Sequence, residues 1–236
     1  MKTLADRWND IFHQTAEEKL GWHENDYTQT LTFLNLIPEW KSAKMFIPGV
    51  GTSGLIELLL RSGPENSSPQ NSSPKNSGPK NSAPQHSGSE LVLNDISSQA
   101  IEIAKHRYGD KKDAIQWLCQ DISTALPADL DDIDIWIDRA VLHFLVDDAA
   151  VEAYFRNVHA AVKPGGYALF AEFSKTGASK CAGLDVRRYD LDELQHHLRA
   201  FEWMAGDEYT YINPTGESRP YLYALFKRTM PIKGPH

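Results

Sequence analysis

The pattern of apolar and polar positions predicts short buried strands that alternate with amphipathic helices. Apolar runs of strand length recur along the chain, and most are followed by a glycine turn or an acidic residue. Because strands that alternate with helices form a parallel sheet with both faces covered, this order predicts a doubly wound α/β fold. The expected parallel strands are residues 45–47, 91–94, 115–119, 133–137 and 167–173.

The two ends of the chain have different patterns. Residues 1–43 carry apolar stripes at helical spacing, which predict an N-terminal helical segment. Residues 208–213 and 221–227 flank the turn Pro214-Thr-Gly and are rich in tyrosine. This arrangement predicts an antiparallel hairpin that closes one edge of the sheet and brings the number of strands to seven.

Residues 64–88 differ in composition from the rest of the chain. They form five pentapeptide units that each begin with proline and contain no large apolar side chain. Such a segment cannot bury enough surface to offset its ordering entropy. We therefore interpret it as a low-complexity Pro/Asn/Ser insert inside a single domain that spans residues 1–236.

Deletion of residues 64–88 is expected to leave the melting temperature and ligand affinity nearly unchanged. The reason is that loop-closure entropy varies slowly with length, by only about 0.6 kcal/mol for each doubling. Thermal unfolding of the full chain and of the deletion variant tests this expectation. A large fall in melting temperature would show that the insert is structural.

Charge and cysteine content narrow the class of protein. The net charge of −8 argues against nucleic acid or an anionic membrane as a partner. No apolar run approaches the roughly 18 residues of a membrane span, and the first residues lack the apolar core of a signal peptide. Cys119 and Cys181 have no metal-ligand spacing. We expect a soluble cytoplasmic monomer without a metal.

A glycine turn follows the first strand. Gly49 and Gly51 lack a Cβ atom, so a ligand can approach the main chain closely, and apolar residues at helical spacing come next. A helix that starts there points its free N–H groups at the ligand. The spacing Gly49-x-Gly51-x-x-Gly54 also fits the dinucleotide fingerprint. The turn alone leaves NAD, another adenosine ligand, or no ligand as open alternatives.

Asp95 follows the second strand at an informative distance. It comes 44 positions after Gly51, and without the 25 residues of the insert the interval is 19. This matches the roughly 20-residue interval at which an acidic residue meets a ribose diol in doubly wound folds. The alternative is that Asp95 caps the helix that follows.

In this order and spacing, the motifs resemble those of class I S-adenosylmethionine-dependent methyltransferases. Residues 46–51 resemble the first motif of that family, Asp95 its ribose acid, and residues 120–122 its adenine-contacting turn. Lys163-Pro-Gly-Gly166 resembles the turn before the fifth strand. The resemblance implies a Rossmann-like fold with S-adenosylmethionine as cofactor. Pro48 departs from the family pattern, because many members carry Asp or Gly there.

A narrower resemblance is to bacterial small-molecule methyltransferases of the thiopurine and tellurite-resistance type. It rests on Trp8…Phe12…Trp22-His-Glu, on residues 138–145 and on residues 180–189. The resemblance implies that the N-terminal helical segment folds over the cofactor as a lid, with Trp22 near it. It also implies a small-molecule substrate.

The candidate site residues fall into three groups. For the cofactor we expect Trp22, Gly49, Gly51, Thr52, Asp95, Ile96, Asp121, Ile122 and Asp138. For the methyl acceptor we expect Arg139, Cys181 and Tyr189, and for catalysis Asp138, Arg139 and His143.

Their expected chemistry is the activation of a nucleophile. Arg139 would raise the thiolate fraction of a nearby thiol, and His143 could take its proton. The alternatives are an Asp138–Arg139 structural ion pair, a histidine with no catalytic part, and a Cys181 that only fills space.

The predicted function is methyl transfer from S-adenosylmethionine to a small nucleophile, such as a thiol or related chalcogen compound. Two alternatives stay open at this point. One is a protein lysine methyltransferase, because an acidic enzyme could attract a basic protein. The other is a cofactor-binding subunit without catalysis of its own.

Overall fold

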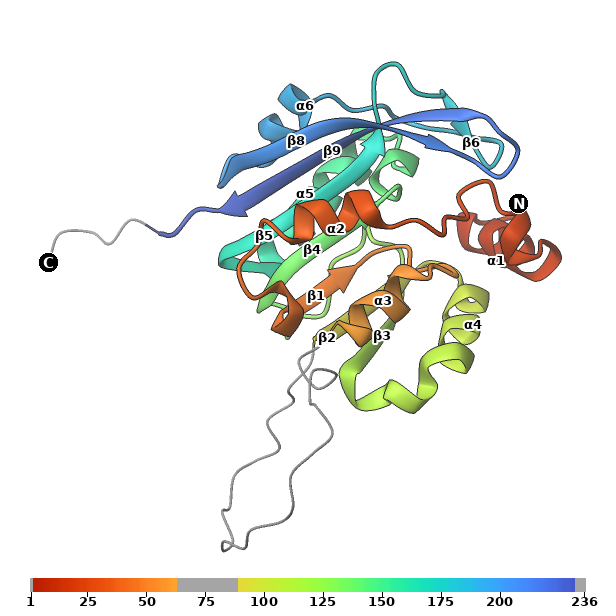
Figure 1. The fold of residues 1–236 in the computed structure, drawn as a ribbon, viewed down its shortest axis with the longest axis horizontal. Helices are drawn as coiled ribbons and strands as arrows, with labels where there is room; N and C mark the ends of the chain where they lie inside the picture. Colours follow the sequence, from red (N-terminus) through yellow and green to blue (C-terminus); the bar gives the residue numbers. More distant parts are fainter. Residues whose placement is uncertain (1, 63–88, 232–236) are drawn as a thin grey trace, which may run out of the picture.

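A computed structural model describes residues 2–62 and 89–231. The chain forms one seven-stranded sheet in the order β3-β2-β1-β4-β5-β9-β8, with helices on both faces (Figure 1). The strands are β1 Lys44–Ile47, β2 Glu90–Asp95, β3 Ile115–Cys119, β4 Ile133–Arg139, β5 Val162–Phe173, β8 Phe201–Ile212 and β9 Ser218–Arg228. A separate two-stranded sheet pairs β6 Lys180–Cys181 with β7 Leu184–Asp185.

Six α-helices lie within the described residues. They are α1 Leu4–Gln14, α2 Thr28–Leu34, α3 Leu55–Arg61, α4 Ser98–Tyr108, α5 Asp148–Ala161 and α6 Leu191–His197. Short 3₁₀ turns are η1 Glu17–Lys19, η2 Trp40–Ser42, η4 Gly109–Ala114 and η5 Leu142–Phe144. None of the helices in the described ranges has the length and apolar character needed to cross a membrane.

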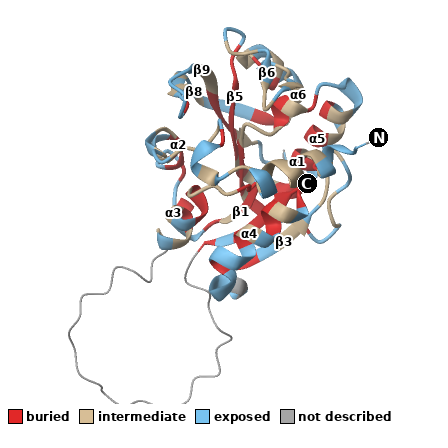
Figure 2. Ribbon diagram, turned by 90° about the vertical axis from the view of Figure 1, so that its right-hand side faces the viewer, coloured by how far each residue is buried: buried red, intermediate tan, exposed pale blue. Residues whose placement is uncertain are grey.

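The core has two layers, one on each face of the sheet. Successive residues of β1 show the division, because Met45 packs with α2, α3 and α4 whereas Phe46 packs with α5 and α6. The central strands are therefore buried on both sides, as Figure 2 shows in red, and the outer helix surfaces are exposed. This double burial is why the parallel strands read as continuous apolar runs in the sequence.

The sequence-based prediction of the fold is confirmed in its main features. Strands β1 to β5 pair in parallel, and β9 and β8 form the antiparallel hairpin at one edge. The doubly wound seven-stranded arrangement was thus readable from the pattern of strands, helices and turns. The expected insert, residues 64–88, lies outside the described residues.

Two local predictions are wrong. Residues 163–166 form no separate turn before the fifth strand; they belong to β5, where the register against β4 shifts between Ile133 and Ile135. Gly165, whose φ is +80°, lies in this bulge. Residues 1–43 are also less helical than expected, because only η1 interrupts the irregular chain between α1 and α2.

Candidate active site

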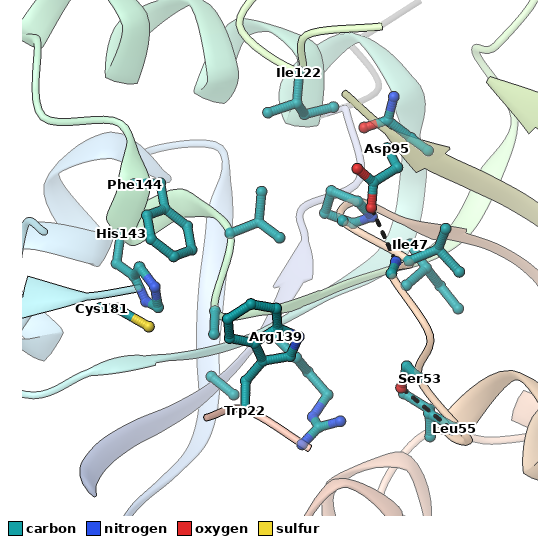
Figure 3. Close-up of a pocket in the computed structure, with 18 of the residues that line it drawn as sticks. Trp22, Ile47, Ser53, Leu55, Asp95, Ile122, Arg139, His143, Phe144 and Cys181 are labelled. Carbon is teal, nitrogen blue, oxygen red and sulfur yellow. Dashed lines mark hydrogen bonds between the residues drawn. The ribbon is translucent and has the colours of Figure 1, made fainter. Parts of the chain in front are cut away.

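A cleft opens at the carboxyl ends of the parallel strands, where α/β sheets generally bind ligands (Figure 3). Its volume of about 180 Å³ far exceeds the roughly 10–15 Å³ that one buried water needs. Loops after β1, β2, β3 and β4 form its floor, and α1, residues 22–27 and the β8–β9 hairpin complete its walls. The cleft therefore accommodates a ligand of many atoms.

The glycine turn after β1 forms the tightest part of the cleft wall. Gly49 and Gly51 have φ angles of +58° and +48°, in the left-handed region that favours glycine. A Cβ atom on Gly49 would lie only 2.2 Å from Cγ2 of Val141. The glycines are thus required both by the backbone conformation and by the close approach of the loop after β4.

Asp95 holds this turn from the end of β2. Its Oδ2 accepts a hydrogen bond from the Gly51 N–H at 2.9 Å, and its Oδ1 accepts one from the Ser97 N–H at 2.8 Å. The helix cap is Ser97, whose Oγ accepts from the Ala100 N–H, so the interpretation of Asp95 as a cap is wrong. Burial raises the pKa of Asp95 to about 6, although the N–H groups of Ser97 and Gly51 lower it.

The neighbouring loops bring further predicted residues to the same cleft. Asp121 lies in the loop after β3, and its Oδ1 accepts hydrogen bonds from the N–H and the hydroxyl of Ser123. These two hydrogen bonds hold Oδ1 of Asp121 against its own loop. The predicted cofactor residues that line the cleft are Trp22, Gly49, Gly51, Thr52, Asp95, Ile96, Asp121 and Ile122.

Trp22 belongs to an aromatic cluster that closes the cleft on the side of α1. Its ring packs edge-on against Trp8 at 5.5 Å and Phe12 at 6.2 Å, and Trp8 contacts Phe144 at 5.0 Å. Asn9 ties α1 to the start of α4, because its Oδ1 accepts hydrogen bonds from the Ser97 hydroxyl and the Gln99 N–H. The N-terminal segment therefore lies over the cleft.

Asp138 does not line the cleft, contrary to the sequence-based prediction of a catalytic and cofactor-binding role. Its side chain is fully buried and accepts hydrogen bonds from the N–H groups of Val141 and Leu142 and from the Tyr154 hydroxyl. Burial and the charge of Glu172 both raise its pKa. Asp138 instead shapes the loop that follows β4.

Arg139 does line the cleft, on the opposite side of β4 from Asp138. Its guanidinium forms an ion pair with Glu24 and lies 5.2 Å from the ring centre of Tyr27. The alternative of an Asp138–Arg139 ion pair is therefore wrong, because successive side chains of a strand point to opposite faces. The negative charge of Glu24 partly neutralises the positive charge of Arg139 at the cleft.

The remaining predicted residues separate into two groups. His143 in η5 and Cys181 in β6 line the cleft near each other (Figure 3). Tyr189 is fully buried and is not among the residues that line the cleft, so its predicted contact with the substrate is wrong. Cys119, the last residue of β3, is exposed.

Part of the cleft wall consists of residues that were not predicted from the sequence. Tyr209 and Tyr211 of β8, Tyr221 and Tyr223 of β9, and the pair Glu24 and Tyr27 all line it. The signal was present, because each tyrosine pair is separated by one residue and so lies on one face of its strand. Among the described residues, no group of three or more histidine, cysteine or acidic side chains could hold a metal ion.

A family profile described as a methyltransferase domain matches residues 80–166. A comparison with curated protein sequences finds no match. Similarity to solved structures extends over nearly the whole chain. One is a protein described in connection with the conversion of a disulfide bond into a thioacetal group during echinomycin biosynthesis. It has a TM-score of 0.68 and 14% identity, and the match covers 96% of this chain and 93% of that one.

Two further similar structures are those of the N-methyltransferase NodS and of the protein TehB. The N-methyltransferase NodS from Bradyrhizobium japonicum WM9, in complex with S-adenosyl-L-homocysteine, has a TM-score of 0.63 and 15% identity, with 94% of this chain and 99% of that chain covered. TehB from Haemophilus influenzae has a TM-score of 0.61 and 13% identity, with coverages of 94% and 67%. At these identities the structures establish a shared fold.

The matched domain and the shared fold are consistent with one another. The chain has the Rossmann-like sheet of these methyltransferase structures, and residues 80–166 match a methyltransferase domain. Of the adenosine ligands that the glycine spacing left open, a methyltransferase domain match favours S-adenosylmethionine over NAD.

Proposed function

We propose that this protein is an S-adenosylmethionine-dependent methyltransferase that acts on a small, soft nucleophile, a thiol or related chalcogen compound. The observation that carries the proposal is the composition of the cleft beyond the glycine turn. That end is walled by tyrosines of β8 and β9 and by Phe144, with His143 and Cys181 among them. The N-terminal segment closes it from the other side, which favours a small acceptor over a lysine on a folded protein.

The proposed cofactor position follows from the residues around the glycine turn. The Asp95 carboxylate stands at the end of β2, where it can accept hydrogen bonds from ribose hydroxyls. Ile96 and Ile122 offer apolar side chains for the adenine, and Asp121 lies beside them. Because Gly49 and Gly51 carry no Cβ, the turn keeps its left-handed backbone and packs closely against Val141 and Phe12 at the cleft wall. The residues present therefore fit S-adenosylmethionine, which supplies a methyl group on a sulfonium.

The acceptor end suits sulfur for two physical reasons. Polarisable sulfur makes favourable contacts with aromatic rings, of about 0.3–1.5 kcal/mol each as measured for thioethers. A water-poor cleft also favours a reaction in which the charges of a thiolate and a sulfonium disappear. Arg139 contributes a positive charge there, but its pairing with Glu24 reduces its effect on an acceptor.

The comparisons support sulfur without excluding nitrogen. The echinomycin-related protein is associated with the formation of a thioacetal, which is chemistry at sulfur. NodS is an N-methyltransferase. An amine is therefore the natural second acceptor to include in any test.

The decisive experiment supplies methyl-labelled S-adenosylmethionine with a panel of acceptors. Each thiol is matched with the amine and the alcohol of the same carbon skeleton, and a separate reaction contains cell lysate. We expect label in low-mass thioethers, with much less in the amine and alcohol products. Label confined to a protein band would favour the lysine alternative, and label only in methylated amines would replace sulfur by nitrogen. Cofactor binding with no transfer to any acceptor would favour the non-catalytic subunit.

A further inference from the structure

A group of buried titratable side chains lies behind the cleft wall, outside the residues assigned above. Glu172 in β5 and Asp138 in β4 are both fully buried. They lie on the same face of the sheet, because Asp138 pairs with Phe170 and Glu172 follows Phe170 by two positions. Burying a carboxylate inside an apolar strand costs free energy unless the carboxylate is paired and hydrogen-bonded, so the position of this group requires an explanation.

Glu172 contacts His143 in two ways. Its Oε2 accepts a hydrogen bond from the His143 backbone N–H at 3.1 Å, and the same oxygen lies 3.1 Å from the ring nitrogen Nδ1. The Nδ1 contact is close but not in line for a hydrogen bond, as is common for catalytic contacts in a ligand-free site. Among the described residues, Nε2 of His143 and Oε1 of Glu172 have no hydrogen-bond partner.

The ring of His143 is held between the buried carboxyl groups and the cleft. It stacks on Phe173 at 4.7 Å and packs against Phe144 at 4.3 Å, and the residue lines the cleft beside Cys181 (Figure 3). With Nδ1 directed to Glu172, the second ring nitrogen, Nε2, is the one available to a bound acceptor. A buried ring nitrogen without a hydrogen-bond partner destabilises the folded protein, and a ligand in the cleft that forms this hydrogen bond would remove the penalty.

The two carboxyl groups share a buried environment that disfavours their ionised forms. Burial raises the pKa of Glu172 to about 8, and burial together with the Glu172 charge raises the pKa of Asp138. Two neighbouring buried carboxyl groups do not both ionise readily, so at least one of them keeps its proton near neutral pH. The hydroxyl of Tyr189, which has no hydrogen-bond partner among the described residues, interacts electrostatically with Glu172 and Asp138, and Cys181 lines the cleft with His143.

We propose that Glu172 is a positioning residue that fixes the tautomer of His143, with the proton on Nδ1, so that Nε2 can take the proton of the methyl acceptor. The proposal rests on the proposed function. The acceptor S–H proton moves to Nε2, a new S–C bond forms as the methyl–sulfonium bond breaks, and S-adenosylhomocysteine leaves as a neutral thioether. The resulting imidazolium favours the ionised form of Glu172, which lies 3.1 Å from Nδ1 and stabilises the ring in return, and the proton of the imidazolium then returns to solvent. Asp138 supports Glu172 from the side of Tyr154.

The first test measures the tautomer directly and needs no acceptor. Nitrogen-15 NMR of the histidine side chains, with the His143 signals assigned by their loss in His143→Gln, should show a protonated Nδ1 and an unprotonated Nε2. In Glu172→Gln, the His143 signals should shift toward the other tautomer. A protonated Nε2 in the wild-type protein, or a tautomer unaffected by Glu172→Gln, would overturn the proposal.

The second test uses thiols of graded acidity. For thiols whose pKa lies well above the assay pH, Glu172→Gln should lower kcat about 10- to 100-fold. This loss does not exceed the usual contribution of a general base to the rate, which is about 100- to 10,000-fold. For thiols that are already ionised at the assay pH, kcat should change less than about threefold. A merely structural role would reduce kcat by the same factor for every thiol, and this result would sink the proposal.

Two controls make the second test sharp. Glu202→Gln, an identical change at an exposed position of β8, should leave kcat unchanged for all thiols. The double variant Glu172→Gln/His143→Gln should lose no more activity than His143→Gln alone, because the two residues act as a unit. If no thiol is methylated but the expected tautomer is observed, the proposed substrate class fails while the positioning role of Glu172 stands.

Discussion

Gly49→Ala is expected to lower the free energy of unfolding by about 2–5 kcal/mol and to abolish most cofactor binding. A left-handed conformation costs a residue with a side chain about 1–2 kcal/mol. The new methyl group would also lie 2.2 Å from Cγ2 of Val141, and such overpacking typically costs about 1–3 kcal/mol. Urea unfolding and calorimetric titration with S-adenosylhomocysteine measure the two effects.

Two further variants separate the backbone cost from the steric clash. Gly216 has a φ of +83° and nothing within 4 Å of its missing Cβ, so Gly216→Ala should cost only the backbone part, about 1–2 kcal/mol. Val141→Ala removes Cγ2, so adding it to Gly49→Ala should recover part of the lost stability relative to Val141→Ala alone. Equal losses for Gly49→Ala and Gly216→Ala would show that Val141 imposes no constraint on the turn.

The glycine turn also illustrates why the fold could be predicted from the sequence. Its information is local, because the chain needs a strand, residues without Cβ and a helix within a short stretch. The hairpin of β8 and β9 was predictable for a similar reason, since a turn sequence separates two runs rich in tyrosine. The bulge in β5 was not predictable, because it depends on the register against β4, which lies far away in the sequence.

The site was harder to predict because its strands are buried on both faces. Asp138 and Arg139 both follow the apolar run of β4, and no alternation of polar and apolar residues shows which one faces the cleft. The predicted substrate contact of Tyr189 was wrong for a related reason, because packing against residues distant in the sequence determines whether Tyr189 is buried. Glu172 carried a readable signal that was overlooked, since a lone carboxylate inside an apolar strand requires a partner or a function.

Asp95 was predicted from spacing alone, and its environment makes the affinity for the cofactor depend on pH. In the ligand-free protein its pKa is about 6, above the ordinary 3.8 because of burial. Ribose hydroxyls would donate hydrogen bonds to the ionised form and so lower this pKa on binding. The free protein then binds more protons than the complex below about pH 6. Affinity should therefore rise with pH up to about pH 6 and level off above it.

The same raised pKa has the opposite consequence for the stability of the ligand-free protein. Between about pH 4 and pH 6, the folded state holds the Asp95 proton more tightly than the unfolded state does. The contribution of Asp95 to the free energy of unfolding should thus fall by about 3 kcal/mol as the pH rises through this window, at about 1.36 kcal/mol per pKa unit. Bound cofactor should offset part of this loss.

Asp95→Asn is expected to weaken the binding of S-adenosylhomocysteine by about 10- to 100-fold at pH 8, and by less at pH 5. The variant loses charge-assisted hydrogen bonds, each of which contributes about 1.5–3 kcal/mol, and it has no carboxyl group to titrate. Calorimetric titration at pH 5, 6, 7 and 8 should therefore give a rising affinity for the wild-type protein and a nearly constant one for Asp95→Asn. Asp185→Asn, an exposed change in β7, serves as the matched control and should follow the wild-type curve. If the wild-type affinity is independent of pH, or if Asp95→Asn retains full affinity at pH 8, Asp95 does not bind the cofactor through an ionised carboxylate.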